Sequence, residues 1–313
     1  MTRAITPELV EPVVAVALGV TDVDGGPTDE QRAVLRALVA GYWRRDDLDI
    51  DAVTFLGPDG VSVIPEGPAR SRVRELLVLL ELCRHPASDA QVDRVDMYAD
   101  ALGESGPGLD LARSLVRSGA RVAMADYYRF LATRHESMAE PSLRAHYAES
   151  LAAPDPELGD RLRGLHDLPA GTLGHEYVEF YRRNGITLPG DDPSMPAVFV
   201  AHDMSHVIAG YAPVGVDEIA LGGMQLVMTD TVDHWAAFLG NLAVHEAAIV
   251  DNEHIAGKTA TLARPGAAER LGHAMWRGAQ CTGDFTAADH LAMADWPLAD
   301  VRARFTVPPL EES

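Results

Sequence analysis

Apolar residues recur along most of the chain at the three- and four-residue spacing of an amphipathic helix. In residues 29–43 this spacing places five apolar side chains on one helix face: Val34, Leu35, Leu38, Val39 and Tyr42. Strict alternation of apolar and polar residues over the length of a strand is rare. The pattern therefore predicts an all-α protein.

An apolar run followed by a loop and a helix start occurs twice, about sixty residues apart. Residues 13–20 precede the tetrapeptide 28–31 (TDEQ), and residues 76–83 precede the tetrapeptide 88–91 (SDAQ). Each tetrapeptide is typical of a capping box, in which hydroxyl and glutamine side chains bond the free backbone amides at a helix start. We therefore expect two helix-loop-helix units in this part of the chain.

A short apolar run, Val61–Ile64, is the one strand-like stretch in the sequence. The Gly and Pro residues on either side of it are typical of turns, and a loop is the alternative interpretation. A third helical stretch is expected over residues 109–131.

Pro, Asp and Gly residues gather between positions 152 and 171, which predicts a linker. A chain of 313 residues corresponds to about two ordinary domains. We expect a helical bundle domain over residues 1–150, followed by a second helical domain over residues 156–313. The apolar helix, Asp/Gly loop and capped helix of the first domain resemble a helical domain of the tellurite-resistance protein B type. A helical bundle without a ligand is the alternative.

The charge balance excludes nucleic acid as a partner. The chain carries 26 basic and 47 acidic residues, and a net charge of −21 repels a phosphate backbone. Lys258 is the only lysine, a bias that indicates a GC-rich bacterial genome.

The sequence also predicts a cytoplasmic protein. Cys83 and Cys281 are too few for a disulfide framework and form no CxxC motif, which fits a reducing compartment. The first 25 residues contain four acidic side chains and lack the pattern of a signal peptide. No apolar run is long enough to span a membrane, although peripheral membrane contact and a homo-oligomeric state stay open.

Four residues carry the candidate chemistry: His202, Asp203, His206 and Glu218. A helix is expected to begin at a Ser194 cap and to end at Gly210, and His202 and His206 lie one turn apart on one face of it. Asp203 is a third ligand or orients an imidazole. A following helix, expected to open near Asp217, places the Glu218 carboxylate opposite the histidines. Two histidines and carboxylates on facing helices are typical of a divalent-metal site.

This arrangement is similar to the HDxxH-x11-E signature of the coenzyme Q biosynthesis protein 4 family. The likeness extends over about residues 160–308. Upstream it includes residues 173–185, with LGHEY and an Asn-Gly turn, and at the far end residues 295–305, with Trp-Pro-Leu and Val-Arg. A position that is often acidic in the family is Gln225 here, and residues 1–150 are an addition to the usual family domain.

The resemblance implies a metal-dependent enzyme with a prenylated quinone precursor or another hydrophobic small molecule as substrate. It implies zinc as the metal, with iron or manganese as alternatives, and a reaction that removes a ring carboxylate and hydroxylates the same carbon. Asp203 and Glu218 are the candidate catalytic residues. The alternative is a non-catalytic, metal-stapled scaffold or a protein that binds lipid or quinone.

The hairpin that carries the motif is rich in apolar residues, which either line a substrate pocket or pack the bundle. These residues are Val198, Phe199, Ile208, Met224 and Leu226.

Other polar residues give weaker signals. His245-Glu246 begins like a zinc-protease HExxH motif, but Ile249 replaces the second histidine. His234 and His254 are interpreted as solvated or hydrogen-bonded side chains. Tyr177 and Tyr181 share a helix face, for which core packing is favoured over catalysis.

Overall fold

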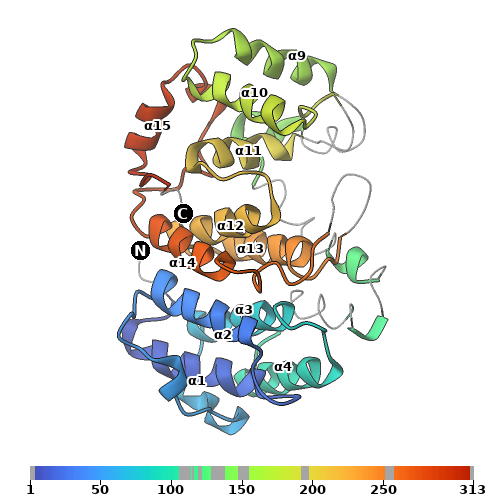
Figure 1. Cartoon of the computed structure of the whole chain (residues 1–313), viewed down its shortest axis with the longest axis vertical. Helices are drawn as coiled ribbons and strands as arrows, with labels where there is room; N and C mark the ends of the chain where they lie inside the picture. The colour runs from blue at the N-terminus through green and yellow to red at the C-terminus, as the bar shows by residue number, and fades with distance from the viewer. Residues whose placement is uncertain are drawn as a thin grey trace. The chain divides into compact units, whose positions relative to one another are not determined.

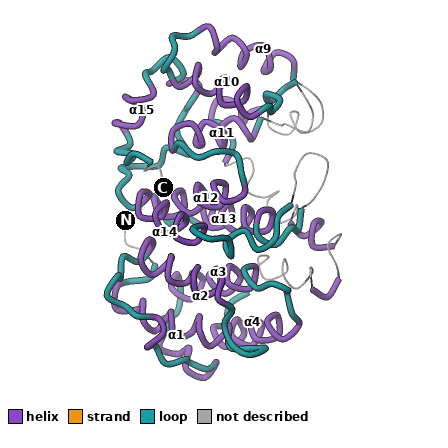
Figure 2. Tube along the Cα trace, in the orientation of Figure 1, coloured by secondary structure: helices purple, strands orange, loops and turns teal. Residues whose placement is uncertain are grey.

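The structure of the chain is a computed structural model that describes residues 4–105, 114, 116–118, 122–127, 138–146, 155–191, 197–250 and 257–310. The regular structure of these residues is helical, and β-pairing among them is limited to two isolated bridges (Figure 2). The expected all-α class is confirmed. In the described residues, no helix combines the length and apolarity needed to cross a membrane.

The chain forms two compact units, which are described separately. Unit 1 combines Met1–Leu131 with Glu218–Ala279, and unit 2 combines Ala132–Asp217 with Gln280–Ser313. Both units therefore contain segments from both halves of the sequence.

Unit 1 is a helical bundle in which helices from the first 131 residues pack against helices from residues 218–279 (Figure 1). Helix α3 contacts α1, α4 and α13, while α14 packs on α2 and on the π-helical turn η2. The helices that the packing of the described residues involves are α1 (Val10–Thr21), α2 (Asp29–Ala37), η2 (Leu38–Tyr42), α3 (Pro68–Leu82), α4 (Asp89–Leu102), α13 (Val232–His245) and α14 (Ala267–Gly278). Helix α12 (Gly215–Thr229) belongs to unit 1 from Glu218 onward.

The two apolar runs of the sequence form the centre of unit 1. Almost every side chain of α1 is buried, as are those from Leu76 to Leu80 of α3. A helix that is apolar on all sides is stable in water only when other elements surround it. The predicted helix-loop-helix units thus become two central helices, each followed by a capped outer helix.

The capping boxes differ between the two helix starts. At α2 the box is complete, because Thr28 Oγ1 accepts from Gln31 N and Thr28 N donates to Gln31 Oε1, both at 3.1 Å. At α4, Ser88 Oγ accepts from Gln91 N, but the Gln91 side chain turns inward. Its Nε2 donates to Val20 O at 2.9 Å, and its Oε1 accepts from Gln31 Nε2 at 3.2 Å. The two glutamines therefore join the repeated units through the core.

We expect Gln91→Ala to destabilise the chain by about 1–3 kcal/mol, because it leaves the buried Val20 carbonyl without a partner. The measurement is urea unfolding followed by circular dichroism. Ser88→Ala is the control, since it removes only the cap and costs about 1 kcal/mol. A smaller loss for Gln91→Ala than for Ser88→Ala would contradict the role of the buried glutamine pair.

Two local expectations are corrected. Residues around Val61 form a 3₁₀ helix, η4 (Pro58–Val63), instead of a strand. The predicted linker over residues 152–171 contains a helix, α9 (Pro156–Gly164), and a 3₁₀ turn, η6 (Leu165–Asp167). Pro156 is favourable in the first turn, and the Asp155 carboxylate accepts from Leu158 N at 3.0 Å, so the residues that suggested a linker start a helix.

The units also differ from the expected division near residue 155. Helices α13 and α14, from the expected second domain, pack on α3 and α2 of the expected first domain. Whether residues 156–313 fold alone stays a prediction. Of the helix expected over 109–131, residues 116–118 and 122–127 are helical, and the remainder lies largely outside the described residues.

Unit 2 is organised around α10 (Leu173–Asn184), which contacts α9, α11 (Val198–Ala209) and α15 (Leu298–Arg304) (Figure 1). The segment before α15 satisfies the free amides at the start of α10: Leu173 N donates to Trp296 O at 2.9 Å and Gly174 N to Ala294 O at 2.8 Å. Residues 173–185 and residues 295–305, which carry the resemblance outside the histidine motif, therefore lie next to each other in unit 2.

Candidate metal centre

The predicted ligands His202, Asp203 and His206 lie together on α11. One nitrogen or oxygen atom from each residue lies within 4.8 Å of the others. The two histidine Nε2 atoms are 3.2 Å apart, and the rings are nearly perpendicular, with centroids 4.8 Å apart. The helical spacing in the sequence thus brings the two imidazoles to one point, as expected.

The His206 ring is held on two sides. Its Nδ1 lies 3.1 Å from the carbonyl oxygen of Tyr211, and Phe180 stacks on the fully buried ring at 5.6 Å. Because a carbonyl only accepts, Nδ1 carries the hydrogen in a neutral ring, and Nε2 presents its lone pair toward His202. This is the tautomer and the anchoring that metal-binding histidines show.

The geometry of the pair fits a metal ion. A tetrahedral zinc ion with Zn–N bonds of about 2.0–2.1 Å separates two ring nitrogens by about 3.3 Å. The observed separation of His202 Nε2 and His206 Nε2 is 3.2 Å. Two imidazoles with a neighbouring carboxylate are also the donor types that zinc, iron and manganese accept.

The Asp203 carboxylate is oriented by a tyrosine from α10. The Tyr181 hydroxyl donates to Asp203 Oδ2, and the Asp203 residue is only 7% exposed. Burial, followed by the negative charge of Asp203, raises the pKa of Tyr181 well above its usual value. Tyr181 therefore remains a neutral donor that fixes the carboxylate beside the histidines.

Core packing is the interpretation that the sequence favours for Tyr177 and Tyr181, and both side chains are buried. The hydrogen bond from Tyr181 to Asp203 was missed, because spacing along one helix gives no information about a partner on another. The two tyrosine rings meet edge to face at 5.0 Å, so Tyr177 supports the ring that holds Asp203.

The C-terminal end of α11 is fixed by residues distant in the sequence. Gly210 adopts a left-handed conformation with φ of 85° and ends the helix, as expected. Arg302 from α15 donates to the carbonyl oxygens of Ile208 and Val207 at 2.9 and 3.0 Å. Asp217 accepts from Ala212 N at 2.9 Å and closes the following turn. Arg302 of α15 thus positions the helix that carries the histidines.

The fourth predicted ligand, Glu218, is the first residue of unit 1, and its place in the metal site stays a prediction. Its backbone carbonyl accepts from Asn241 Nδ2 at 3.1 Å. Helix α12 begins at Gly215, slightly earlier than expected. The predicted Ser194 cap lies outside the described residues.

The apolar residues of the hairpin are divided between two environments. Ile208, Met224 and Leu226 have no exposed surface, so each packs against protein on all sides. Phe199 is partly exposed, and its ring lies 6.4 Å from the His202 ring. The Val198 side chain lies outside the described part. Of this set, Phe199 is the residue placed to meet a ligand beside His202.

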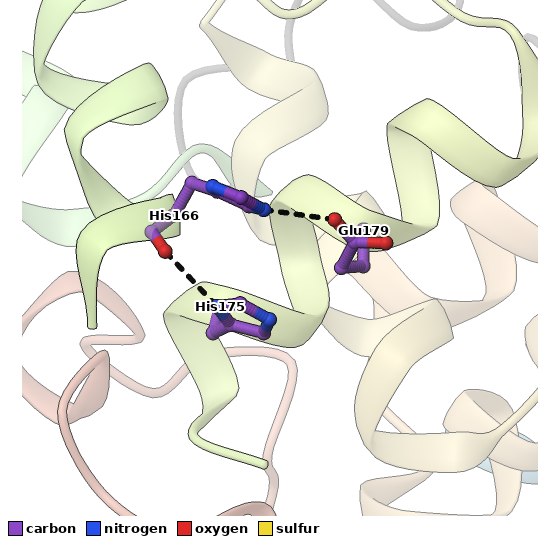
Figure 3. Close-up of side chains that lie close together, drawn as sticks. All are labelled: His166, His175 and Glu179. Atoms are coloured by element: carbon purple, nitrogen blue, oxygen red, sulfur yellow. Dashed lines mark hydrogen bonds and ion pairs between the residues drawn. The ribbon is translucent and has the colours of Figure 1, made fainter. Parts of the chain in front are cut away.

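A second group in unit 2 consists of His166, His175 and Glu179 (Figure 3). His166 Nε2 lies 2.9 Å from the Glu179 carboxylate, and His175 Nδ1 lies 3.0 Å from the His166 carbonyl oxygen. The Arg182 guanidinium is 3.1 Å from Glu179 and 2.8 Å from His166 Nε2. Because Arg182 supplies the positive charge that Glu179 attracts, we interpret this group as an ion-pair network.

Of the two histidines interpreted as solvated or hydrogen-bonded, His234 and His254, the structure describes only His234. His234 Nδ1 lies 2.6 Å from Thr231 Oγ1 and 3.0 Å from Thr229 Oγ1, which confirms a hydrogen-bonded side chain. His254 lies outside the described residues.

The comparisons with known proteins give little further information. No family model matches the sequence, and no curated protein is similar enough to count as a relative. Among solved structures, a protein of Nostoc punctiforme described as a "putative ubiquinone biosynthesis protein" is 18% identical. The match covers 76% of this chain and 99% of that chain at a TM-score of 0.37. Such a low TM-score supports no conclusion about the site, so the function must be argued from the residues of this chain.

Proposed function

We propose that the chain is a metal-dependent enzyme that acts on an apolar, ring-bearing substrate. The metal ligands in this proposal are His202, Asp203 and His206, with Glu218 as the fourth. The observation that carries it is the 3.2 Å separation of the two Nε2 atoms, with the Nδ1 of His206 directed to a carbonyl oxygen. The resemblance of the HDMSH segment and Glu218 to a quinone-biosynthesis signature supports the choice of substrate class.

The donor set favours zinc, with iron or manganese as alternatives. When bound, such an ion supplies Lewis-acid stabilisation for negative charge that develops on a ring carboxylate or phenolate. Around it, His206 and Phe180 form a rigid, buried wall, while His202 and Phe199 are the more exposed side. We expect a substrate ring to approach from the side of His202.

The carboxylates are assigned separate tasks in this proposal. Asp203 is fixed by the Tyr181 hydroxyl, so it keeps its orientation when a substrate enters. Glu218 is assigned the delivery of the proton that replaces the departing CO2 on the ring carbon during decarboxylation, in addition to metal binding. Both tasks require a carboxylate and are lost when an amide replaces it.

A non-catalytic, metal-stapled scaffold is the second candidate. The observation that favours it is the complete burial of Ile208, Met224 and Leu226, since these residues leave no space around themselves for a ligand. In this case the metal only holds α11 in place. The two candidates predict the same metal content and differ in turnover.

The test is conversion of a prenylated aromatic carboxylic acid by the metal-loaded full chain, followed by mass spectrometry. We expect Glu218→Gln to abolish turnover and to leave the helical circular dichroism spectrum unchanged, because the substitution removes charge but keeps shape. Glu179→Gln is the matched control, since the same change falls in the ion-pair network of His166 and should retain turnover.

Unchanged turnover in Glu218→Gln would exclude Glu218 from the chemistry. A metal-loaded wild-type chain that converts none of the compound would favour the scaffold.

A further inference from the structure

Two buried glutamates and one partly exposed histidine of unit 1 form a group that has no part in the proposed function: Glu30, Glu246 and His85. Glu30 lies in the first turn of α2, His85 follows α3, and Glu246 follows the last residue of α13. His85 Nε2 lies 2.7 Å from Glu246 Oε1 and 4.0 Å from Glu30 Oε2. One nitrogen or oxygen atom from each residue lies within 4.8 Å of the others. Three separate elements of the bundle therefore bring donor atoms to one point.

A single basic side chain of the described residues faces the two carboxylates of this group. The side chains of Glu246 and Glu30 are 0% and 7% exposed, and His85 is the only basic residue of the described chain within ion-pair distance of either carboxylate. Burial, together with the neighbouring Glu246 carboxylate, raises the pKa of Glu30 to about 9. Two ionised carboxylates beside one imidazole are expensive to desolvate, so Glu30 keeps its proton unless a bound cation displaces it and compensates both charges.

One oxygen atom of the group has no partner. Glu246 Oε2 accepts a hydrogen bond from Leu262 N at 2.8 Å, whereas Glu30 Oε1 is buried without a hydrogen-bond partner in the described structure. Buried polar atoms are satisfied in the great majority of cases, so an orphaned carboxylate oxygen indicates a missing ion or water. A divalent cation would satisfy this oxygen and neutralise both carboxylates at the same time.

The geometry points to a second divalent-metal site, formed by Glu30, His85 and Glu246 in unit 1. One imidazole and two carboxylates are donors that zinc, manganese and iron share. The bound ion joins α2, the end of α3 and the end of α13, so it acts as a staple in the bundle. The site goes beyond the proposed function, because it shares no residue with the His202 motif.

The network of His166, His175 and Glu179 provides a contrast. There, the Arg182 guanidinium contacts both the glutamate and an imidazole, whereas the described residues place no Arg or Lys in ion-pair contact with Glu30 or Glu246. An arginine therefore balances the glutamate charge in the group of His166, His175 and Glu179. No arginine or lysine of the described residues does so in the group of Glu30, His85 and Glu246. Glu179→Gln is accordingly the matched control for Glu30→Gln.

The experiment is elemental analysis of the full chain after saturation with Zn²⁺ and removal of free metal. We expect Glu30→Gln to lose one equivalent of zinc per chain relative to wild type, and Glu179→Gln to lose none. The same loss is expected when Glu30→Gln is added to a chain that carries His202→Ala and His206→Ala. This second comparison keeps the result independent of the proposed function, because it does not require the histidine motif to bind metal.

Thermal unfolding measures whether the proposed second ion stabilises the chain. In the chain with His202→Ala and His206→Ala, a chelator should lower the melting temperature, and adding Glu30→Gln should remove this shift. Without metal, Glu30→Gln should leave the melting temperature nearly unchanged, since glutamine replaces a protonated glutamic acid of the same shape. Equal zinc content and an equal chelator shift with and without Glu30→Gln would overturn the site. His85→Gln is a second variant, with the same losses expected, should Glu30→Gln fail to fold.

Discussion

A chain that carries both His202→Ala and His206→Ala is expected to lose one full equivalent of bound metal and all turnover. The two Nε2 atoms stand 3.2 Å apart, and each substitution removes one of the two nitrogen donors from the site. Asp203 and Glu218 alone are a poor set for zinc, because two protein ligands leave half of a tetrahedral shell to water. Elemental analysis of the purified full chain measures the loss.

The matched control is the double variant His166→Ala and His175→Ala, which removes the same number of histidines from the ion-pair network of unit 2. It should retain the metal content of the wild type. Circular dichroism is used to check that both double variants are folded. Equal metal content in the two double variants would show that the histidines of α11 bind no ion.

The second large effect is expected for Gly41→Ala, which should destabilise the chain by about 3 kcal/mol or more. A Cβ atom at position 41 would lie 2.3 Å from the carbonyl oxygen of Gly272 and 2.9 Å from Met275 Cβ. Overpacking a core costs about 1–3 kcal/mol when side chains can adjust, and here the nearest atom belongs to the backbone of α14. Urea unfolding of the full chain measures the change.

Gly164→Ala is the control for the glycine substitution. Gly164 is also helical, with φ of −61°, and its added Cβ would meet nothing within 4 Å. This variant should be neutral or more stable by about 0.4–1 kcal/mol. A similarly small effect of Gly41→Ala would contradict the close packing of α14 on η2, and with it the composition of unit 1.

The sequence predicted those features that depend on neighbours along the chain. The three- and four-residue spacing gave the all-α class, the Thr28 tetrapeptide gave the start of α2, and Gly210 gave the end of α11. The close approach of His202 and His206 could also be predicted from the sequence, because one helical turn separates the two residues. In each case the physical cause lies within a few residues of the feature.

Features that depend on distant residues could not be predicted in this way. The hydrogen bond from Tyr181 to Asp203 and the capping of α11 by Arg302 join different helices, and neither has a signal in spacing. The packing of α13 and α14 on the first half of the chain is of the same kind. The expected boundary near residue 155 was based on the composition of a short segment. Composition does not indicate which distant helices pack together.

Glu246 of unit 1 shows why local spacing does not reveal a partner from another part of the chain. Glu246 belongs to an incomplete zinc-protease motif, in which Ile249 stands where the second histidine would be. The imidazole that contacts Glu246 comes instead from His85, 161 positions earlier. A pattern of local spacing cannot identify such a partner.

The most direct test of the metal centre is a crystal of the zinc-saturated full chain, measured on both sides of the zinc absorption edge. We expect an anomalous peak at about 2.0–2.1 Å from Nε2 of both His202 and His206. The Nδ1 of His206 should still be directed to the Tyr211 carbonyl. An anomalous map without a peak at these two atoms, in which the imidazoles are hydrogen-bonded only to each other, would contradict the account.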